Sequence, residues 1–212
     1  MKPLPFLVGF AAALSGCVFR HEVTDLDPQS GQPPLVVEKK IPGKVAVAIV
    51  GNLRQPLVIQ STKVSGRMIG GDQEVTIHLG EPLKKAVTAA LTEATAEPTF
   101  VEREDQAIAL ARQGSSAIVV RYNGASGSGD MRQSGFSWES SMTVTLAGEV
   151  RLIAPGAKEE RRSFSTYGAD RRTTFSMSWA DHAVPAPKAA TEQAISKFAL
   201  RVVAEATAAL AK

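Results

Sequence analysis

The sequence predicts an α+β fold in which a twisted, largely antiparallel sheet packs against two helices. Residues 136–152 alternate between apolar and polar types, which is typical of a strand with one buried face. Residues 83–94 and 188–210 carry apolar side chains at helical spacing. The 212 residues, 44% of them hydrophobic, suit one globular domain and exclude a disordered chain or a membrane protein with many spans.

The N-terminus has the three-part layout of a secretory signal. Lys2 precedes an uncharged apolar stretch over residues 4–14, which is shorter than the roughly 20 residues that span a bilayer. The stretch ends in Leu14, Ser15, Gly16 and Cys17. These four residues resemble the bacterial lipobox, which implies lipidation of the Cys17 thiol, cleavage after Gly16 and acylation of the new amino group. The alternatives are a conventional secretory signal with Cys17 near the cut, or a buried N-terminal helix.

The lipobox resemblance implies an envelope protein anchored by lipid. Two or three acyl chains on Cys17 exceed what stable membrane anchoring requires. The next residue is Val18, not the aspartate that tends to hold such proteins in the inner membrane, so the resemblance implies the outer membrane. We expect a signal peptide over 1–16, a lipidated Cys and flexible tether over 17–43, and a single periplasmic domain over 44–212. Alternatively, part of the tether, such as residues 35–37, lies on the domain as an edge strand.

The first half of the expected domain contains a strand, a hairpin and a helix. Residues 44–51 are rich in β-branched side chains and predict a buried strand. Strands over 57–64 and 73–79 are expected to pair through a turn at 69–72, where two glycines allow positive φ. Pro82 is compatible with the first turn of the helix over 83–94.

Shorter elements follow Pro98, which we expect to prevent further helix. Residues 100–101 predict a short strand, and residues 104–113 a short helix that ends at Gly114. Residues 117–122 predict another strand. The segment 123–135 is rich in glycine and serine and is expected to be a mobile loop.

The alternating run over 136–152 predicts a long strand that bends or bulges at Gly148. Pro155 and Gly156 turn the chain, so residues 160–167 are expected to return as the antiparallel partner. Residues 169–187 are expected to be irregular. The C-terminal helix over 188–210 has one apolar stripe, made of Ile195, Phe198, Ala199, Val202, Val203, Ala206 and Leu210.

This order of elements resembles the YajG-like family of outer-membrane lipoproteins and, more loosely, the LptE-like lipoproteins. The resemblance rests on the lipobox, a first strand over 45–49, a helix over 83–94 and a strand pair over 140–167 before a C-terminal helix. The strands between residues 57 and 79 favour the YajG-like pattern, because the LptE-like order passes directly from first strand to helix. The resemblance implies a location and a fold without an activity.

The sequence contains no pattern that specifies a reaction, a cofactor or a metal site. His21, His78 and His182 lack the spacing of helical metal ligands. The glycines of residues 124–129 match neither a dinucleotide motif nor a nucleophile elbow, and a strand follows them where such a site needs a helix. Asp181 and His182 are adjacent, which is not the geometry of a catalytic triad. We therefore expect a protein that is not an enzyme and has no cofactor.

Charge suggests one candidate binding cluster. The net charge of +3 argues against a nucleic-acid partner. Four arginines near the ends of a strand could bind anionic groups, such as lipopolysaccharide phosphates or peptidoglycan carboxylates: Arg161, Arg162, Arg171 and Arg172. The alternative is a solvated sheet edge whose charges discourage strand pairing. Phe175, Met177 and Trp179 are either an exposed docking patch or part of the core.

Three functional hypotheses follow from the sequence. The first is a membrane-anchored envelope lipoprotein that is not an enzyme and acts as a binding or assembly module in the periplasm. Its partners would be another envelope protein, lipopolysaccharide or peptidoglycan, besides the membrane that holds the lipid on Cys17. The second is a structural subunit of an outer-membrane complex, and the third is a periplasmic hydrolase.

Overall fold

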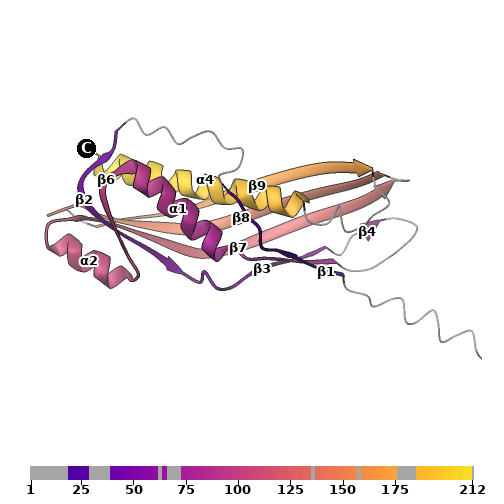
Figure 1. The fold of residues 1–212 in the computed structure, drawn as a ribbon, viewed down its shortest axis with the longest axis horizontal. Coiled ribbons are helices and arrows are strands. Elements are labelled where there is room, and N and C mark those ends of the chain that lie inside the picture. The colour runs from indigo at the N-terminus through magenta and orange to yellow at the C-terminus, as the bar shows by residue number, and fades with distance from the viewer. Residues whose placement is uncertain are drawn as a thin grey trace, which may run out of the picture.

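A computed structural model describes residues 19–28, 39–61, 64–65, 73–134, 137–156, 159–175 and 185–211. Cys17 and the other lipobox residues lie outside this part of the chain, as do His182 and residues 176–184. The fold is α+β, as the sequence predicts, with sheets packed against helices. Figure 1 shows the long strands running beneath two of the helices.

The larger sheet is mixed, and the long pairings among β7, β8 and β9 make it largely antiparallel, as expected. Its six strands follow the order β6-β2-β7-β8-β9, and the short β4 pairs with β7. β2 is parallel to both β6 and β7, whereas β7, β8 and β9 are antiparallel to one another. The strands are β2 (Ile41–Gly51), β4 (Val64–Ser65), β6 (Thr95–Val101), β7 (Ser116–Ser134), β8 (Ser137–Ile153) and β9 (Glu160–Phe175).

Strand β7 corrects the expectation of a mobile loop over 123–135. It continues through the glycine-rich stretch to Ser134, and it pairs with β8 along this whole stretch, ending with Ser134 opposite Ser137 of β8. A Cβ atom at Gly127 would lie 2.4 Å from a side-chain atom of Ile59, and one at Gly129 would lie 2.6 Å from Met142. Glycine is therefore present there because neighbouring side chains approach the strand closely.

Strand β8 confirms the predicted alternation, with one correction. Met142, Val144, Leu146, Val150 and Leu152 are all buried. The expected bulge is on the partner strand, because the register shifts between Tyr122 and Gly124 of β7. Gly148 is instead required by packing, since a Cβ atom there would lie 2.5 Å from the ring of Phe198.

The return strand β9 confirms the predicted hairpin and is longer than expected. It pairs with β8 from Glu160 to Phe175, so residues 169–175, expected to be irregular, belong to the sheet. Gly156 has the positive φ of 68° that suits the turn.

A smaller sheet has the order β1-β5-β3. Its strands are β1 (Phe19–Val23), β3 (Leu57–Ser61) and β5 (Gln73–Ile77). The antiparallel pairing of β3 with β5 confirms the predicted hairpin, whose turn residues 69–72 lie outside the described residues. β1 is parallel to β5, and Val23 is only 2% exposed. The expected flexible tether over 17–43 therefore does not hold for Phe19–Val23, nor for residues 41–43, which begin strand β2.

Three helices occur in the described residues, and they lie on both faces of the larger sheet. α1 (Gly80–Ala94) and α4 (Pro185–Leu210) cover one face, and α2 (Glu104–Arg112) lies on the other (Figure 1). All three were predicted with boundaries that differ by a few residues. The two helices that the sequence predicts to cover the sheet are α1 and α4, which lie on one face, and α2 lies on the opposite face.

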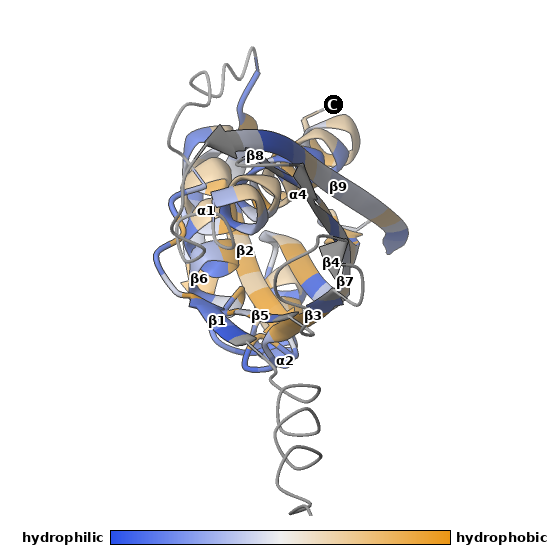
Figure 2. Cartoon of the chain, turned by 90° about the vertical axis from the view of Figure 1, so that its right-hand side faces the viewer, coloured by the Kyte–Doolittle hydropathy of each residue, from blue (hydrophilic) through white to orange (hydrophobic). Residues whose placement is uncertain are grey.

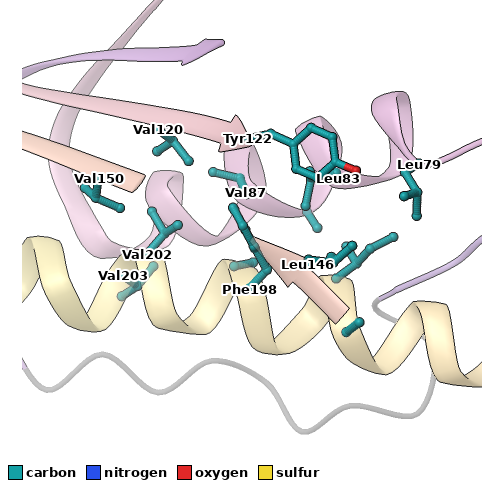
Figure 3. Packing of buried hydrophobic residues seen from close by; sticks show 14 of the residues in the cluster. Leu79, Leu83, Val87, Val120, Tyr122, Leu146, Val150, Phe198, Val202 and Val203 are labelled. Carbon is teal, nitrogen blue, oxygen red and sulfur yellow. The ribbon is translucent and has the colours of Figure 1, made fainter. Parts of the chain in front are cut away.

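The main core lies between the larger sheet and helices α1 and α4. Figure 3 shows Phe198 and Val202 of α4 directed toward Leu146, Val150 and residues of α1. The predicted stripe of α4 is buried from Ile195 to Ala206, and Phe198 is 0% exposed. On the other face, α2 contributes small residues such as Ala107 and Ala111 to a second apolar cluster.

Candidate functional site: a groove between strand β9 and helix α4

Strand β9 is at one end of the larger sheet. It pairs with β8 on one side, and no strand of the described residues pairs with its other side. We call this outer side the free edge of β9. Figure 2 shows β9 at the outside of the molecule with hydrophilic stretches, whereas β2 in the middle of the sheet is largely hydrophobic. β9 has 16 residues, which is long for an edge strand, because its unpaired N–H and C=O groups could pair with another chain.

The backbone groups that face the free edge can be identified from one contact. The Lys197 ammonium group donates a hydrogen bond of 3.0 Å to the backbone carbonyl of Tyr167, so this carbonyl points away from β8. In an antiparallel ladder, the N–H and C=O of one residue face the same side, and the side alternates along the strand. The β8–β9 register has no shift, so Ser163 and Ser165 also direct their N–H and C=O to the free edge.

Helix α4 runs beside this edge and forms a groove with it. The open groove has a volume of about 660 Å³ and is lined by Ser163, Phe164, Ser165, Thr166, Tyr167, Lys197, Leu200, Arg201 and Ala204. Tyr167 and Leu200 are large apolar residues that remain 62% and 43% exposed. The Lys197 ammonium group lies 4.8 Å from the centre of the Tyr167 ring, in a cation–π contact.

The charged residues that line the groove are both cations. Lys197 and Arg201 come from successive turns of α4, and none of the other lining residues is acidic. Arg201 pairs at 2.5 Å with Glu205, which also accepts a hydrogen bond of 2.8 Å from Arg162. Glu205 is 8% exposed, and its carboxylate pairs with both arginines, so it compensates part of the charge of Arg201 at the groove.

The four arginines predicted as an anion site do not come together. Along β9, side chains alternate between faces, which separates Arg161 and Arg171 from Arg162 and Arg172. Arg162 and Arg171 are nine positions apart, which corresponds to about 30 Å of strand. Each arginine pairs with a carboxylate: Arg161 with Glu159, Arg162 with Glu160, Arg171 with Glu139 and Arg172 with Asp170. Anion binding by these arginines stays a prediction.

An ion-pair network fastens α2 to the sheet on the face opposite α4. Glu104 at the start of α2 accepts hydrogen bonds of 2.5 Å from both Arg121 of β7 and Arg151 of β8. Arg151 also pairs with Glu159, which accepts a 2.6 Å bond from Arg161. Partial burial tends to raise the pKa of Glu104, but the hydrogen bonds and charges of the two arginines outweigh it and lower this pKa below 4.5.

A second recess lies on the same face, farther along the strands. Asp130, Glu139, Ser141 and Arg171 line it, and its volume is about 150 Å³. Arg171 pairs with Glu139 there. The recess is small and its charges compensate one another, so it is a weaker candidate than the groove.

The described residues contain no group of three His, Cys, Asp or Glu side chains that could hold a metal ion. His78 follows β5 and lies 2.7 Å from the carboxylate of Glu22. His21 lies in β1, and residues 124–129 form part of β7. Of the apolar trio, Phe175 ends β9, while Met177 and Trp179 lie outside the described part. No helix among the described residues is long and apolar enough to cross a membrane.

Sequence reasoning missed the groove residues of α4. Lys197, Leu200, Arg201 and Ala204 follow the helical spacing i, i+3, i+4 and i+7, beside the buried stripe. Ser163, Ser165 and Tyr167 follow the period of two expected of a strand face. Both signals are visible in the sequence, but each alone looks like an ordinary solvated face. Only the packing of α4 against β9 brings the two together.

Comparisons with known proteins give structural likenesses at low identity. No protein-family model matches the sequence, and no curated protein matches it. A protein from Xanthomonas campestris of the DUF330 family is 14% identical, with a TM-score of 0.42 over 89% of this chain and 92% of that one. A minor lipoprotein from Acinetobacter baumannii is 11% identical, with a TM-score of 0.34 over 82% of this chain and 94% of that one.

A third solved structure is a neuraminyllactose-binding hemagglutinin homologue from Helicobacter pylori. It is 11% identical, with a TM-score of 0.46 over 86% of this chain and 91% of that chain. Likenesses at this level define neither a family nor an activity for the present chain.

Proposed function

We propose that this protein is a lipid-anchored binding module of the bacterial envelope and that the groove between β9 and α4 is its binding surface. The observation that carries the proposal is the groove itself, an open surface of about 660 Å³ between a free strand edge and a helix. Exposed Tyr167 and Leu200 provide apolar contact area, and two cations provide charge. Such a combination of aromatic, apolar and cationic groups is typical of binding surfaces.

The N-terminal sequence supports the anchored part of the proposal. The lipobox-like residues ending at Cys17 imply a lipid anchor, and Val18 after it favours the outer membrane. The module would then face the periplasm and bind another envelope component. The residues that form the groove are suited to contact and contain no nucleophile paired with a base, so the proposed role is binding, not catalysis.

The test combines anchoring with contact in living cells. A photoreactive benzoylphenylalanine replaces Leu200 in the groove, and in a control variant it replaces Lys85, which is exposed on α1. We expect illumination to give a discrete cross-linked product from the groove position and none from the control position. Cys17→Ser should abolish palmitate labelling, release the protein from the membrane fraction and reduce the cross-linking.

Two results would contradict the proposal. Equal cross-linking from both positions, or none from either, would show that the groove is not a binding surface. Unchanged palmitate labelling of Cys17→Ser would show that the protein is not anchored through this residue.

A further inference from the structure

We infer that the groove receives an extended acidic segment of a partner protein, which pairs with β9 as an additional strand. The inference rests on the proposed function, because it names the occupant of the same surface. Strand addition to an exposed sheet edge is a common mode of peptide recognition, in which backbone hydrogen bonds give affinity and side-chain pockets give specificity. Three features of the groove support it.

The first feature is the backbone of the free edge. Ser163, Ser165 and Tyr167 direct their N–H and C=O groups away from β8, at the spacing that an incoming strand requires. The outward carbonyl of Tyr167 accepts its hydrogen bond from a lysine side chain at 3.0 Å. This lysine belongs to helix α4, and a charged group placed against a sheet edge discourages indiscriminate strand pairing. A partner must therefore offer this lysine another acceptor.

The second feature is charge. Lys197 and Arg201 are the charged residues that line the groove, and Arg201 also pairs with Glu205, which is not among the lining residues. Arg161 and Arg171 of the same strand are exposed but pair with Glu159 and Glu139, so Lys197 contributes most to the positive charge of the groove. A carboxylate on the incoming segment gives the Lys197 ammonium group a charged acceptor in exchange for the Tyr167 carbonyl, and charge-assisted hydrogen bonds are the stronger kind. The charge of the groove therefore selects an acidic segment over a basic one.

The third feature is the apolar wall. Leu200 and Ala204 of α4 are exposed and line the groove together with Phe164 and Tyr167 of β9. Successive side chains of an extended segment point to opposite faces. A segment that alternates apolar and acidic residues can therefore place its apolar side chains against this wall and its carboxylates near the cations.

The same charges disfavour a second copy of this chain as the occupant. If two β9 strands paired antiparallel about Tyr167, Arg162 of each copy would lie opposite Arg172 of the other. The Lys197 side chains of both copies would also meet at the centre of the contact. Like charges placed directly opposite one another destabilise a strand pair.

The binding experiment uses the full-length protein in detergent micelles and three fluorescein-labelled octapeptides. One alternates valine and glutamate, one alternates valine and lysine, and one is the valine–glutamate peptide with N-methyl groups on alternate backbone nitrogens. We expect fluorescence anisotropy to show binding of the first peptide, at least tenfold weaker binding of the second and loss of binding by the third. Affinity for the first peptide should fall as salt is added.

Variants of the protein locate the bound peptide. Ser165→Pro removes an N–H that faces the free edge, and an edge strand tolerates proline at such a position. It should abolish binding, whereas Ser165→Ala keeps the N–H and should bind as the wild type does. Lys197→Gln together with Arg201→Gln should weaken binding about tenfold. Lys85→Gln, a change of one exposed cation on α1, should leave binding unchanged.

The outcomes separate this inference from the proposed function. Equal binding of the acidic and basic peptides, or binding that survives both N-methylation and Ser165→Pro, would overturn strand addition by an acidic segment. If no peptide binds but cross-links still form at Leu200 in cells, the binding surface stands and its occupant is of another kind. A cross-link between two copies of this chain at Leu200 would identify the occupant as a second copy and overturn the inference.

Discussion

The aromatic ring of Phe198 occupies a space that the sheet leaves open because residue 148 is glycine. A Cβ atom at Gly148 would lie 2.5 Å from this ring. The ring of Phe164 packs against the ring of Phe198, with 4.9 Å between the two centroids. The sequence indicates that Gly148 is unusual within an alternating strand, since glycine weakens a strand interior. It does not indicate that an aromatic side chain from a helix 50 residues later requires it.

Phe198→Ala should lower the free energy of unfolding by about 3 to 5 kcal/mol, because it leaves a cavity in the main core. Urea unfolding of the variant and the wild type measures the difference. Leu200→Ala is the matched control on the same helix, since Leu200 is 43% exposed, and it should cost less than about 1 kcal/mol. Equal effects of the two changes would show that α4 does not bury the face assigned to it.

The candidate site shows how far single residues can be interpreted from the sequence. The arginines of β9 are conspicuous in the sequence, and they suggest one anion-binding cluster. Their partners depend on register, which places Arg171 opposite Ser141 and within reach of Glu139 on β8, and on helix packing, which places Arg162 against Glu205. Lys197 is an unremarkable surface lysine until its contact with the Tyr167 carbonyl is known.

At the scale of elements, the glycine-rich half of β7 was the main error of the sequence prediction. Glycine and serine are typical of turns, and residues 123–135 have no apolar alternation. Strand formation there is imposed by neighbours, because β8 pairs with the whole segment and β3 packs close to Gly127. Strand propensity depends strongly on such context, which local sequence does not contain.

The attachment of α2 to the sheet should depend on pH through Glu104. The folded state lowers the pKa of this carboxyl below 4.5, so its ion pairs stabilise the fold above that pH. The contribution is lost as the pH falls through the lowered value, where protonation releases Arg121 and Arg151. We therefore expect the free energy of unfolding to decrease between pH 5 and about pH 2, as carboxylates become protonated.

Glu104→Gln isolates this contribution. At pH 7 it should lower the free energy of unfolding by about 1 to 2 kcal/mol, since hydrogen bonds to charged groups are lost. The decrease in the free energy of unfolding between pH 5 and about pH 2 should be smaller in this variant than in the wild type, as measured by urea unfolding at the two ends of this pH range. Glu102→Gln changes a nearby exposed carboxylate and should alter neither result. A wild-type pH dependence that Glu104→Gln leaves intact would place the responsible carboxylates elsewhere.

At the scale of the whole molecule, the sequence predicted the class of fold and most elements in order. Local periodicity was sufficient for the β8–β9 hairpin and for α4, whose patterns are long. It was insufficient for the parallel pairings of β2 with β6 and β7, because these join segments that are distant in the sequence. It also did not predict β1, a polar five-residue strand whose partner β5 lies some 50 residues later.

The position of β1 changes the expected boundary of the folded unit. Val23 is buried in the main core, the Asp27 N–H donates a 2.8 Å hydrogen bond to Glu192, and Asp25 pairs with Lys188 at 3.3 Å. Residues 19–28 thus attach the N-terminal segment to β5 and to α4. We compare three soluble chains, which begin at residues 18, 29 and 44, by thermal unfolding.

The chain from residue 18 should be the most stable of the three. Loss of Val23 from the core alone costs about 1.5 to 3 kcal/mol, and 1.5 kcal/mol corresponds to about 3 to 6 °C for a domain of this size. The chain from residue 44 also loses Ile41, a residue of β2 that is 0% exposed in the main core, so it should be the least stable of the three. Both shortened chains lack β1, so both should unfold at a lower temperature than the chain from residue 18. They also leave one side of β5 unpaired, which should increase aggregation. Equal unfolding temperatures for all three chains would instead support a folded unit that begins at residue 44, with the preceding segment acting only as a tether.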